Sequence, residues 1–348
     1  MLLFYGTICL ENKNLYNVSL IKKTMIGKKA IITGGGGFLG SNLSRKLVDL
    51  NFNVSLFIKD GQSKNNTRGI ENKIEIIEGD LLDEEKVKIA IEGKDYLFHF
   101  AWQTDLKKSM ENPCEDFKND LGGLINILES CKKINSNIKV IFPSTVTVIG
   151  FPKKLPSNEN ESENPISIYD VNKLTAEKYL RFYYDNHNIK SCVLRLSNVF
   201  GEYQKIDNPN RGILNFMIGR ALREEPLTIY GDGKWIRDYC YVQDYIDAFI
   251  LAAKSEKTNG EIYVLGSREG RSFNEAIEKI KEITKQLTGK AVLIKHVPFP
   301  DKEHEINKRN FIADYSKFYR ATGWKPKISF DEGMRKTIEF YVNEMSKT

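Results

Sequence analysis

A tyrosine and a lysine four residues apart, Tyr169 and Lys173, are the side chains of this sequence best suited to acid/base chemistry. They begin a segment with the periodicity of an amphipathic helix, so their side chains lie on one face. A neighbouring cation favours the phenolate, and we expect Lys173 to lower the pKa of Tyr169 from its reference of ~10. Such a tyrosine can accept the proton of an alcohol. Taken alone, the pair is more typical of a half-buried tyrosine beside a solvated lysine.

Hydroxyl groups shortly before Tyr169 in the sequence favour a catalytic role for this pair. The apolar run 139–142 ends in Pro-Ser-Thr-Val-Thr-Val-Ile-Gly over residues 143–150. We expect Thr145 to donate a hydrogen bond to a substrate hydroxyl or to orient it, while Lys173 also holds the ribose of a nicotinamide cofactor. Together these groups indicate oxidation of a secondary alcohol by hydride transfer, or the reverse reaction.

A glycine-rich turn supplies a place for that cofactor. Residues 30–40 read Ala-Ile-Ile-Thr-Gly-Gly-Gly-Gly-Phe-Leu-Gly, so an apolar strand leads through Gly34, Gly37 and Gly40 into helical spacing. Glycine lets the backbone approach a ligand closely, and the start of a helix offers unpaired N–H groups to a pyrophosphate. A glycine pattern on its own is weak, but the strand before it and the helix after it indicate a dinucleotide site.

The ends of the next two strands bear on the choice of cofactor. The run 54–58 ends in Lys59 and Asp60. A carboxylate at this place suits the ribose 2′-OH of NAD, whereas a basic residue suits the 2′-phosphate of NADP. Lys59 favours NADP and Asp60 favours NAD, so the choice stays open. After the run 74–77, Asp80 could accept a hydrogen bond from an adenine amino group or cap the next helix.

Apolar runs alternate with helical segments in the first half of the chain, which predicts an α/β fold with a doubly wound parallel sheet of Rossmann type. Ligands of such sheets lie beyond the carboxyl ends of the strands. We expect a dinucleotide-binding domain over 25–200 plus about 236–265. A smaller, mostly helical substrate domain is expected over about 201–235 plus 266–345. Residues 1–24 are expected to be a loosely ordered extension.

Composition excludes several other classes of protein. The 348 residues can bury a full core, and the formal net charge of +6 is spread over lysine-rich segments with acidic neighbours, which does not suggest a nucleic-acid partner. The five cysteines are scattered and the four histidines form no cluster near them, so we expect a reducing, cytoplasmic compartment and no metal. The apolar stretch 2–10 is too short to span a membrane.

The order of the motifs resembles that of the extended short-chain dehydrogenase/reductases, in the NAD-dependent epimerase/dehydratase branch that acts on nucleotide sugars. The resemblance runs from Met25 to about Phe340. The motifs that carry it are Thr33-Gly34-x-x-Gly37-x-x-Gly40, Gly79-Asp80-Leu81, Asn119-x-x-Gly122, Ser144-Thr145, Tyr169-x-x-x-Lys173, Leu194-Arg195-x-x-Asn198-Val199-Phe200-Gly201, the segment from Ile229 to Asp244, and Gly323-Trp324-x-Pro326.

The resemblance implies roles for further residues by their position. It assigns Phe38 and Leu39 to the cofactor turn, Leu81 to the adenine end, and Ser197 to the nicotinamide end. With the residues above, the expected cofactor set is Gly34, Gly37, Phe38, Leu39, Gly40, Lys59, Asp80, Leu81, Phe100, Ala101, Asn119, Tyr169, Lys173 and Ser197.

The resemblance also implies a substrate set, which consists of Thr145, Tyr169, Asn198 and Arg237. Asn198 and Arg237 fall where such enzymes hold the nucleotide diphosphate of the substrate. A guanidinium suits a diphosphate, although a structural Arg237–Asp238 pair is the alternative.

Departures from the family pattern narrow the activity. Val146 and Thr147 stand where 4,6-dehydratases carry an Asp-Glu pair that eliminates water, which disfavours a dehydratase. Trp102 replaces a small residue and would narrow the site near the nicotinamide and the sugar. The stretch 112–129 is somewhat similar to CDP-tyvelose 2-epimerases, but it is too short to choose a substrate.

We therefore expect a nucleotide-sugar epimerase similar to UDP-glucose 4-epimerase. Tyr169 would take the proton of a ring hydroxyl while hydride moves to the bound nicotinamide, and hydride would return to the other face of the keto-sugar. A one-way reductase of a 4-keto sugar would share every residue named. A non-catalytic dinucleotide-binding sensor is the alternative of another class, and the intact catalytic residues argue against it. If this chain forms a homodimer as members of the family do, we expect the helices over 117–131 and 169–184 to pair in it.

Overall fold

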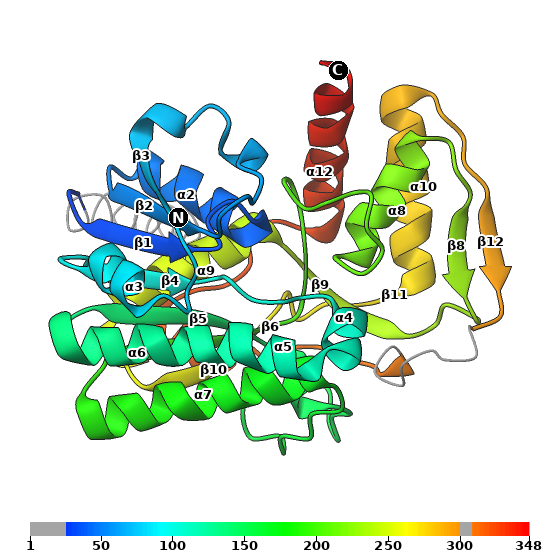
Figure 1. The fold of residues 1–348 in the computed structure, drawn as a ribbon. Helices are drawn as coiled ribbons and strands as arrows, with labels where there is room; N and C mark the ends of the chain where they lie inside the picture. The colour runs from blue at the N-terminus through cyan, green and yellow to red at the C-terminus, as the bar shows by residue number, and fades with distance from the viewer. Residues whose placement is uncertain (1–25, 300–307, 348) are drawn as a thin grey trace, which may run out of the picture.

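The computed structural model describes residues 26–299 and 308–347, and the expected extension over 1–24 lies outside them. Its centre is a sheet of seven parallel strands in the order β10-β6-β5-β4-β1-β2-β3 (Figure 1). The strands are β1 (Lys29–Thr33), β2 (Asn53–Ile58), β3 (Ile74–Glu78), β4 (Tyr96–His99), β5 (Lys139–Thr145), β6 (Ser191–Leu196) and β10 (Glu261–Leu265). The strand order reverses at β1 and β4, as in a doubly wound sheet, so the predicted α/β fold is confirmed.

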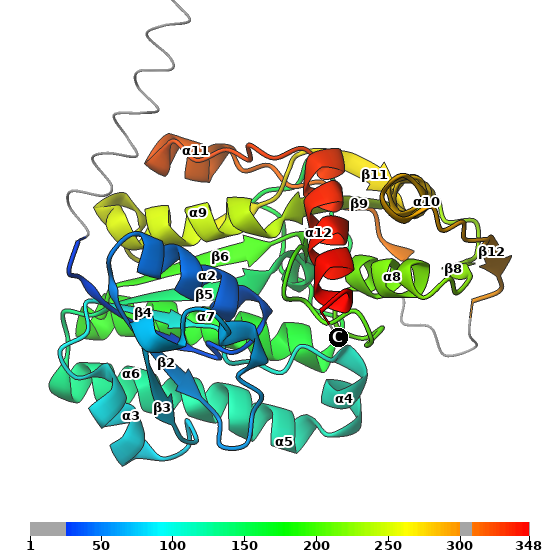
Figure 2. The ribbon, with the colours of Figure 1, turned by 90° about the horizontal axis from the view of Figure 1, so that it is seen from above.

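Helices cover both faces of this sheet because its strands are apolar on both sides. In β1, Ile31 and Ile32 pack into different cores, since successive strand residues point to opposite faces. Helices α2 (Phe38–Asp49) and α9 (Val242–Lys254) cover one face (Figure 2). Helices α3 (Glu84–Ile91), α6 (Gly123–Ile134) and α7 (Ile168–His187) cover the other. The result is a three-layer sandwich whose carboxyl edge faces the remainder of the chain.

Helix α7 begins at a well-defined cap, which sets the position of Tyr169. Ser167 is the N-cap residue, and its hydroxyl oxygen accepts a hydrogen bond of 3.1 Å from the backbone N–H of Asp170. Tyr169 therefore lies in the first turn of the helix, next to the end of β5, and Lys173 lies one turn further along.

The helix expected over 117–131 is interrupted in the structure. Helix α5 (Pro113–Phe117) passes through a π-helical turn, Lys118–Gly122, into α6. Such a turn inserts an extra residue into the helical repeat and is frequent at functional sites. It carries Asn119, which is half-buried, and Asp120, which is buried. Apolar periodicity does not reveal the insertion because the buried face continues on both sides of it.

A smaller second part is built from later segments. It contains a pair of parallel strands, a three-stranded sheet and three helices. The strands are β7 (Asn198–Phe200), β8 (Leu227–Tyr230), β9 (Ile236–Tyr241), β11 (Gly270–Ser272) and β12 (Ile294–Val297), and the helices are α8 (Ile213–Leu222), α10 (Phe273–Thr288) and α12 (Phe330–Met345). Figure 1 shows these elements beside the large sheet, beyond its carboxyl edge.

The structure differs from the expected domain boundaries. Strands β7 and β9, which we assigned to the dinucleotide-binding domain, form the three-stranded sheet of the second part together with β11. Conversely, one segment that we assigned to the substrate domain packs on the first. Helix α11 (Ser316–Thr322) packs on the large sheet, where the rings of Phe318 and Tyr263 lie 4.9 Å apart. The ammonium of Lys317 donates a hydrogen bond of 2.8 Å to the carbonyl of Ile262 in β10. The chain thus returns to the first domain between β12 and α12, where Phe318 and Trp324 join the buried core that contains Tyr263.

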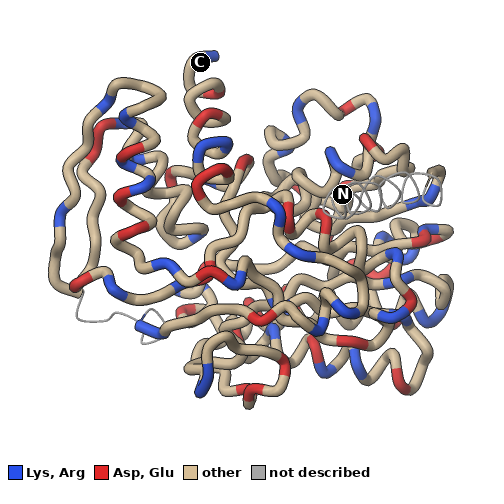
Figure 3. The backbone as a smooth tube through the Cα atoms, turned by 180° about the vertical axis from the view of Figure 1, so that it is seen from behind, with Lys and Arg blue, Asp and Glu red and all other residues tan. Residues whose placement is uncertain are grey.

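Charges of both signs are interspersed over the molecule (Figure 3). Many ion pairs join partly exposed side chains that are close in sequence, such as Lys88 and Glu84 at 3.0 Å. Within residues 26–299 and 308–347, no helix is long and apolar enough to cross a membrane. The charges that matter for chemistry are the buried ones at the carboxyl edge.

Candidate active site

The glycine turn after β1 forms a cradle with no side chain in it. Gly34 has φ +68°, and a Cβ there would lie 2.8 Å from the backbone nitrogen of Ala101. At Gly40 a Cβ would lie 2.4 Å from the carbonyl oxygen of Gly34, so both positions require glycine. Gly37 is the N-cap of α2, and no side chain caps that helix. Its first N–H groups are therefore available to an anion, which fits the pyrophosphate of a dinucleotide.

Apolar residues predicted for the cofactor surround this turn. Phe38 and Leu39 form the first turn of α2 and are half-buried. Phe100 follows β4, donates its N–H to the carbonyl of Thr33 at 3.1 Å, and packs on Phe249 with ring centres 4.7 Å apart. The ends of β1 and β4 are thus joined directly at the point where the strand order reverses.

Two residues predicted for the ribose and adenine end lie together. The ammonium of Lys59, after β2, is 3.2 Å from the carboxylate of Asp80, after β3. The backbone N–H of Leu82 and the Lys59 charge hold the pKa of Asp80 below its usual value. Leu81 is half-buried, and its carbonyl accepts a hydrogen bond of 3.0 Å from Asn126. Asp60 points away to solvent with 65% of its side chain exposed.

The π-helical turn adds a buried carboxylate to the site. Asp120 accepts the backbone N–H of Gln103 at 3.0 Å, which ties the loop after β4 to this turn. Burial raises the pKa of Asp120, although that hydrogen bond opposes the shift. Asn119, its neighbour in the turn, is half-buried at the same edge and remains a predicted cofactor ligand.

Lys173 lies in an aromatic pocket. Its ammonium is 4.1 Å from the ring centre of Trp102 and 4.3 Å from that of Phe142, and it donates a hydrogen bond of 2.8 Å to the carbonyl of Pro143. Burial lowers the pKa of Lys173, while the charges of Asp120 and Glu177 oppose that shift. Trp102 thus forms a wall of the lysine pocket, a role that its place in the sequence did not indicate.

The expected effect of Lys173 on Tyr169 is wrong for this structure. The pKa of Tyr169 is raised, first by burial and then by the charges of Asp170, Asp120 and Asp116. The ammonium of Lys173 lies 6.0 Å from the Tyr169 ring centre and is turned towards Pro143. Spacing on the helix placed both groups correctly on one face, but it could not show the three carboxylates that surround the phenol.

Thr145 ends β5 as predicted and belongs to a chain of polar groups. Its hydroxyl oxygen is 2.8 Å from that of Thr147, and the Thr147 hydroxyl donates a short hydrogen bond to Asp170. The other carboxylate oxygen of Asp170 accepts the Ser167 hydroxyl at 2.7 Å. Asp170 is fully buried.

Two guanidinium groups lie together where a substrate diphosphate was expected. Arg237 in β9 donates a short hydrogen bond to the carbonyl of Arg309. Burial, followed by the charge of Arg237, lowers the pKa of Arg309 to about 9. Arg309 is only 4% exposed, and its Nη1 has no hydrogen-bond partner among the described residues. Arg237 is half-buried beside the buried Arg309, and the charge of Asp170 opposes the lowering of the Arg309 pKa. An anion between the two guanidinium groups would remove their repulsion.

Asn198, which we assigned to the substrate, and Ser197, which we assigned to the nicotinamide, differ in how many hydrogen bonds their side chains make. Asn198 begins β7 beside β9 and is half-buried. The hydroxyl of Ser197 lies 2.8 Å from that of Tyr245 and donates to Asp238 at 3.1 Å. Asp238 also accepts backbone N–H groups of Ser267, Arg268 and Ala313, so it ties several loops together. The role of Ser197 at the nicotinamide stays a prediction.

Sequence reasoning missed Asp170, Arg309 and His99. Asp170 was read only as the residue after Tyr169, and Arg309 stands in no spaced pattern. His99 ends β4 and is fully buried, with Nδ1 2.8 Å from the hydroxyl of Thr33. Burial lowers the pKa of His99 to about 3. The position of His99 at the carboxyl end of a strand was the one signal that could have marked it.

Comparison with known proteins shows the family to which this chain belongs. A family model described as GDP-mannose 4,6 dehydratase matches residues 31–337. A UDP-N-acetyl-alpha-D-glucosaminuronate decarboxylase of Bacillus cytotoxicus is 32% identical over 328 residues, which cover 90% of this chain and 98% of the relative. The chain belongs to the NAD-dependent epimerase/dehydratase family of extended short-chain dehydrogenase/reductases, which is a family of enzymes.

Two solved structures show how closely the fold is shared. The UDP-glucose 4-epimerase of Thermotoga maritima with UDP-glucose superposes with a TM-score of 0.82 and 30% identity, over 91% of this chain and 99% of that chain. The UDP-glucose 4-epimerase of Thermus thermophilus in complex with NAD gives a TM-score of 0.78 and 29% identity, over 90% and 99% of the two chains.

Among the described residues, no group of three or more His, Cys, Asp or Glu side chains could hold a metal ion.

Proposed function

We propose that this protein is a nucleotide-sugar epimerase that resembles UDP-glucose 4-epimerases. The observation that supports the proposal is that Lys173, one helical turn after Tyr169, bonds the carbonyl of Pro143 two residues before Thr145, at the sheet edge that also carries the glycine turn. The solved epimerases from Thermotoga maritima, with UDP-glucose, and from Thermus thermophilus, with NAD, support it.

The cofactor would be a nicotinamide dinucleotide, held by the glycine turn at its pyrophosphate and by residues around Asp80 at its adenine end. When bound, it would accept a hydride from the sugar and return it. We favour NAD over NADP, because the ammonium of Lys59 is 3.2 Å from Asp80 and its charge is already partly neutralised. Titration of both cofactors tests this, and tighter binding of NADP would contradict it.

Tyr169 would act as the acid/base group. It holds or releases a proton at its phenolic oxygen as a ring hydroxyl of the sugar becomes a ketone and is restored. Thr145 would bind that hydroxyl. Lys173 would contribute its positive charge from the aromatic pocket, where the carbonyl of Pro143 and the ring of Trp102 keep it in place.

The diphosphate of the substrate would lie at Arg237 and Arg309, with Asn198 beside them. The unpartnered Nη1 of Arg309 and the lowered pKa of its guanidinium are both relieved when an anion binds. The nucleotide base and the sugar are then determined by the surrounding loops.

Other reactions of the family require different side chains at residues 146 and 147. A dehydratase needs an acid and a base at residues 146 and 147, and this chain has Val146 and Thr147, whose hydroxyl is bonded to Asp170. A keto-sugar reductase shares the catalytic residues named above and is the second candidate. The relative from Bacillus cytotoxicus makes a decarboxylase a third outcome to test.

The decisive experiment uses the purified protein without added reduced cofactor. Its denatured supernatant is examined for bound nicotinamide, and UDP-, dTDP-, CDP- and GDP-sugars are then incubated with the intact protein. An epimerase interconverts two sugar nucleotides and needs no net reductant. Stoichiometric consumption of NADH or NADPH with a keto-sugar would identify a reductase, and release of CO₂ from a uronate would identify a decarboxylase. Cofactor binding without any turnover would support the sensor.

We further propose that the protein works as a homodimer in the cytoplasm. Helix α7 exposes Val171, Tyr179 and Phe182, which lie on one face, and α5 exposes Phe117. The cysteines within the described residues are free thiols, which suits a reducing compartment. Sedimentation of the wild type and of Phe182→Glu tests the dimer, because a charge at the interface would leave monomers.

A further inference from the structure

The residue after the catalytic tyrosine has a side chain that the proposed chemistry does not yet use. Asp170 is fully buried in the first turn of α7. It is not the cap of that helix, because the cap hydrogen bond runs from its backbone N–H to Ser167. Burying a carboxylate is costly unless hydrogen bonds compensate it. Within the described residues, Thr147 and Ser167 each donate a hydrogen bond to it, and its charge also interacts with that of Arg309.

These hydrogen bonds have a defined direction. The single hydrogen of the Thr147 hydroxyl is given to a carboxylate oxygen of Asp170. The contact of 2.8 Å between the hydroxyls of Thr145 and Thr147 must then be donated by Thr145. The backbone N–H of Thr147 also donates to the Thr145 oxygen at 3.2 Å, which holds its rotamer. One lone pair of Thr145 remains for the site.

We propose that Asp170, acting through Thr147, is a positioning residue that fixes the direction of the Thr145 hydroxyl. Thr145 then meets a hydroxyl of the sugar as a hydrogen-bond acceptor and does not point its own hydrogen at it. The sugar part of this inference rests on the proposed function. Thr147, which stands where dehydratases carry an acidic residue, would then connect Asp170 to Thr145 in this chain.

Kinetics of single variants test whether the chain of hydroxyls works as a unit. In Asp170→Asn the amide can donate to Thr147 and reverse the chain, and in Thr147→Val the chain is cut. We expect each to lower kcat about tenfold, the effect of one charge-assisted hydrogen bond, with KM changed less than twofold. Thr147→Ser keeps the hydroxyl and retains activity. Asp185→Asn, an exposed change on the same helix, is the matched control.

Double variants separate an effect of Asp170 that passes through Thr147 from a direct effect of the Asp170 charge on the site. The part of the Asp170→Asn loss that passes through Thr147 should vanish in the Thr147→Val or Thr145→Val background, because the path from Asp170 to Thr145 is already broken. The charge of Asp170 also raises the pKa of Tyr169, and the pH profile of kcat reports that effect separately. Strictly additive losses would mean that Asp170 acts only through its charge, and would overturn the inference. An Asp170→Asn protein as active as the wild type would do the same while leaving the epimerase proposal intact.

A second measurement does not depend on turnover. Neutron diffraction from crystals of the deuterated protein locates the hydroxyl hydrogens. We expect deuterium between Thr145 and Thr147 and between Thr147 and Asp170. Deuterium on Asp170, or a Thr145 hydroxyl turned away from Thr147, would refute the proposed direction. If the wild type converts no nucleotide sugar, the proposed function fails, and this experiment still decides the direction of the chain.

Discussion

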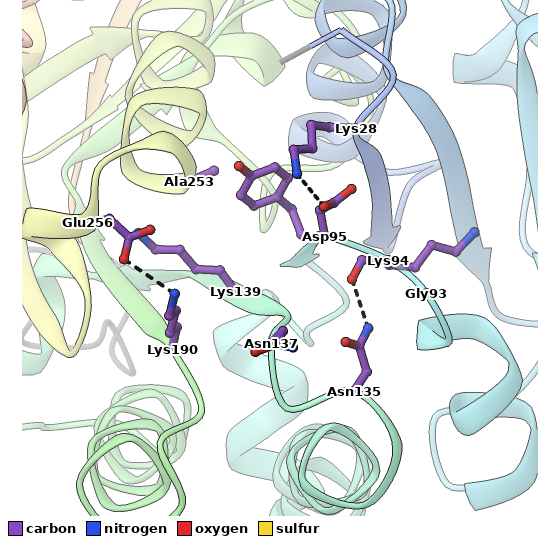
Figure 4. A pocket seen from close by; sticks show the side chains of 11 residues that line it. Lys28, Gly93, Lys94, Asp95, Asn135, Asn137, Lys139, Lys190, Ala253 and Glu256 are labelled. Atoms are coloured by element: carbon purple, nitrogen blue, oxygen red, sulfur yellow. Dashed lines mark hydrogen bonds and ion pairs between the residues drawn. The ribbon is translucent and has the colours of Figure 1, made fainter. Parts of the chain in front are cut away.

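The two edges of the parallel sheet treat their polar side chains in opposite ways. At the amino edge, residues before β1, β4, β6 and β10 line a hollow of about 320 Å³ (Figure 4). Lys28 pairs with Asp95 at 2.7 Å and Lys190 with Glu256 at 3.5 Å, and these side chains remain partly exposed. Even the buried ammonium of Lys139 donates to Ser255 and Thr258. The charges of this edge are satisfied within the protein.

The carboxyl edge leaves polar groups unsatisfied and holds them in unusual protonation states. His99 Nε2, Trp102 Nε1 and Arg309 Nη1 are buried without a hydrogen-bond partner in the part of the chain that the structure describes. Burial shifts the pKa values of His99, Tyr169 and Lys173 in the direction of the neutral form. These unpaired groups and shifted pKa values lie together at the carboxyl edge, which favours it as the functional one, although burial also lowers the pKa of Lys139 at the amino edge to about 8.

The largest expected effect is at the phenol of Tyr169. Tyr169→Phe removes only the ionisable oxygen and should lower kcat by ~10²- to 10⁴-fold, with dinucleotide binding preserved. Steady-state assays and cofactor titration measure the two quantities. Tyr179→Phe, an exposed tyrosine on the same helix, should have no effect. Near-full turnover of Tyr169→Phe would contradict the assignment of the acid/base group to Tyr169 at the carboxyl edge.

The next largest effect is expected at the pair of guanidinium groups. Arg309→Ala should raise the KM for a nucleotide sugar by about 10- to 100-fold, the loss of charged hydrogen bonds to a diphosphate. Dinucleotide affinity should stay unchanged, and Arg320→Ala on the surface of α11 is the control. If dinucleotide affinity falls as well, Arg309 does not separate the two ligands as we propose.

His99 predicts a pH dependence of stability. Its pKa is about 3 in the folded protein and ~6.5 when unfolded, so the unfolded chain binds the extra proton. The free energy of unfolding should therefore fall as pH drops below about 6.5, by up to ~1.4 kcal/mol per pH unit from this residue. Denaturant titrations between pH 4.5 and 7 measure the slope. His99→Phe should flatten it, whereas His187→Gln should not, and equal slopes would contradict the assignment.

The smallest effect is expected at the amino edge. Lys190→Ala removes a partly exposed ion pair with Glu256 and should change the free energy of unfolding by less than about 1 kcal/mol. The kinetic constants should equal those of the wild type. A large loss of activity would show that the amino-edge hollow takes part in function and would break the contrast drawn above.

Local features were the ones that could be predicted from the sequence. The glycine turn, the strand before it and the helix after it are neighbours in the chain, so spacing and residue type were sufficient to locate Gly34, Gly37 and Gly40. The same holds for Tyr169 and Lys173, which share a helix, and for Thr145 at a strand end. The alternation of strands and helices predicted the parallel sheet because each unit must bury its own apolar face.

Distant contacts and burial could be seen only in the folded chain. Asp170 lies 23 residues from Thr147, and Arg309 lies 72 residues from Arg237, so no spacing rule joins them. The pKa of Tyr169 was predicted with the wrong sign because desolvation and three carboxylates, two of them from the segment 113–122, outweigh one lysine. Residue types and spacing determine which groups can react, whereas the dielectric surroundings that set their protonation arise only when separate segments pack together.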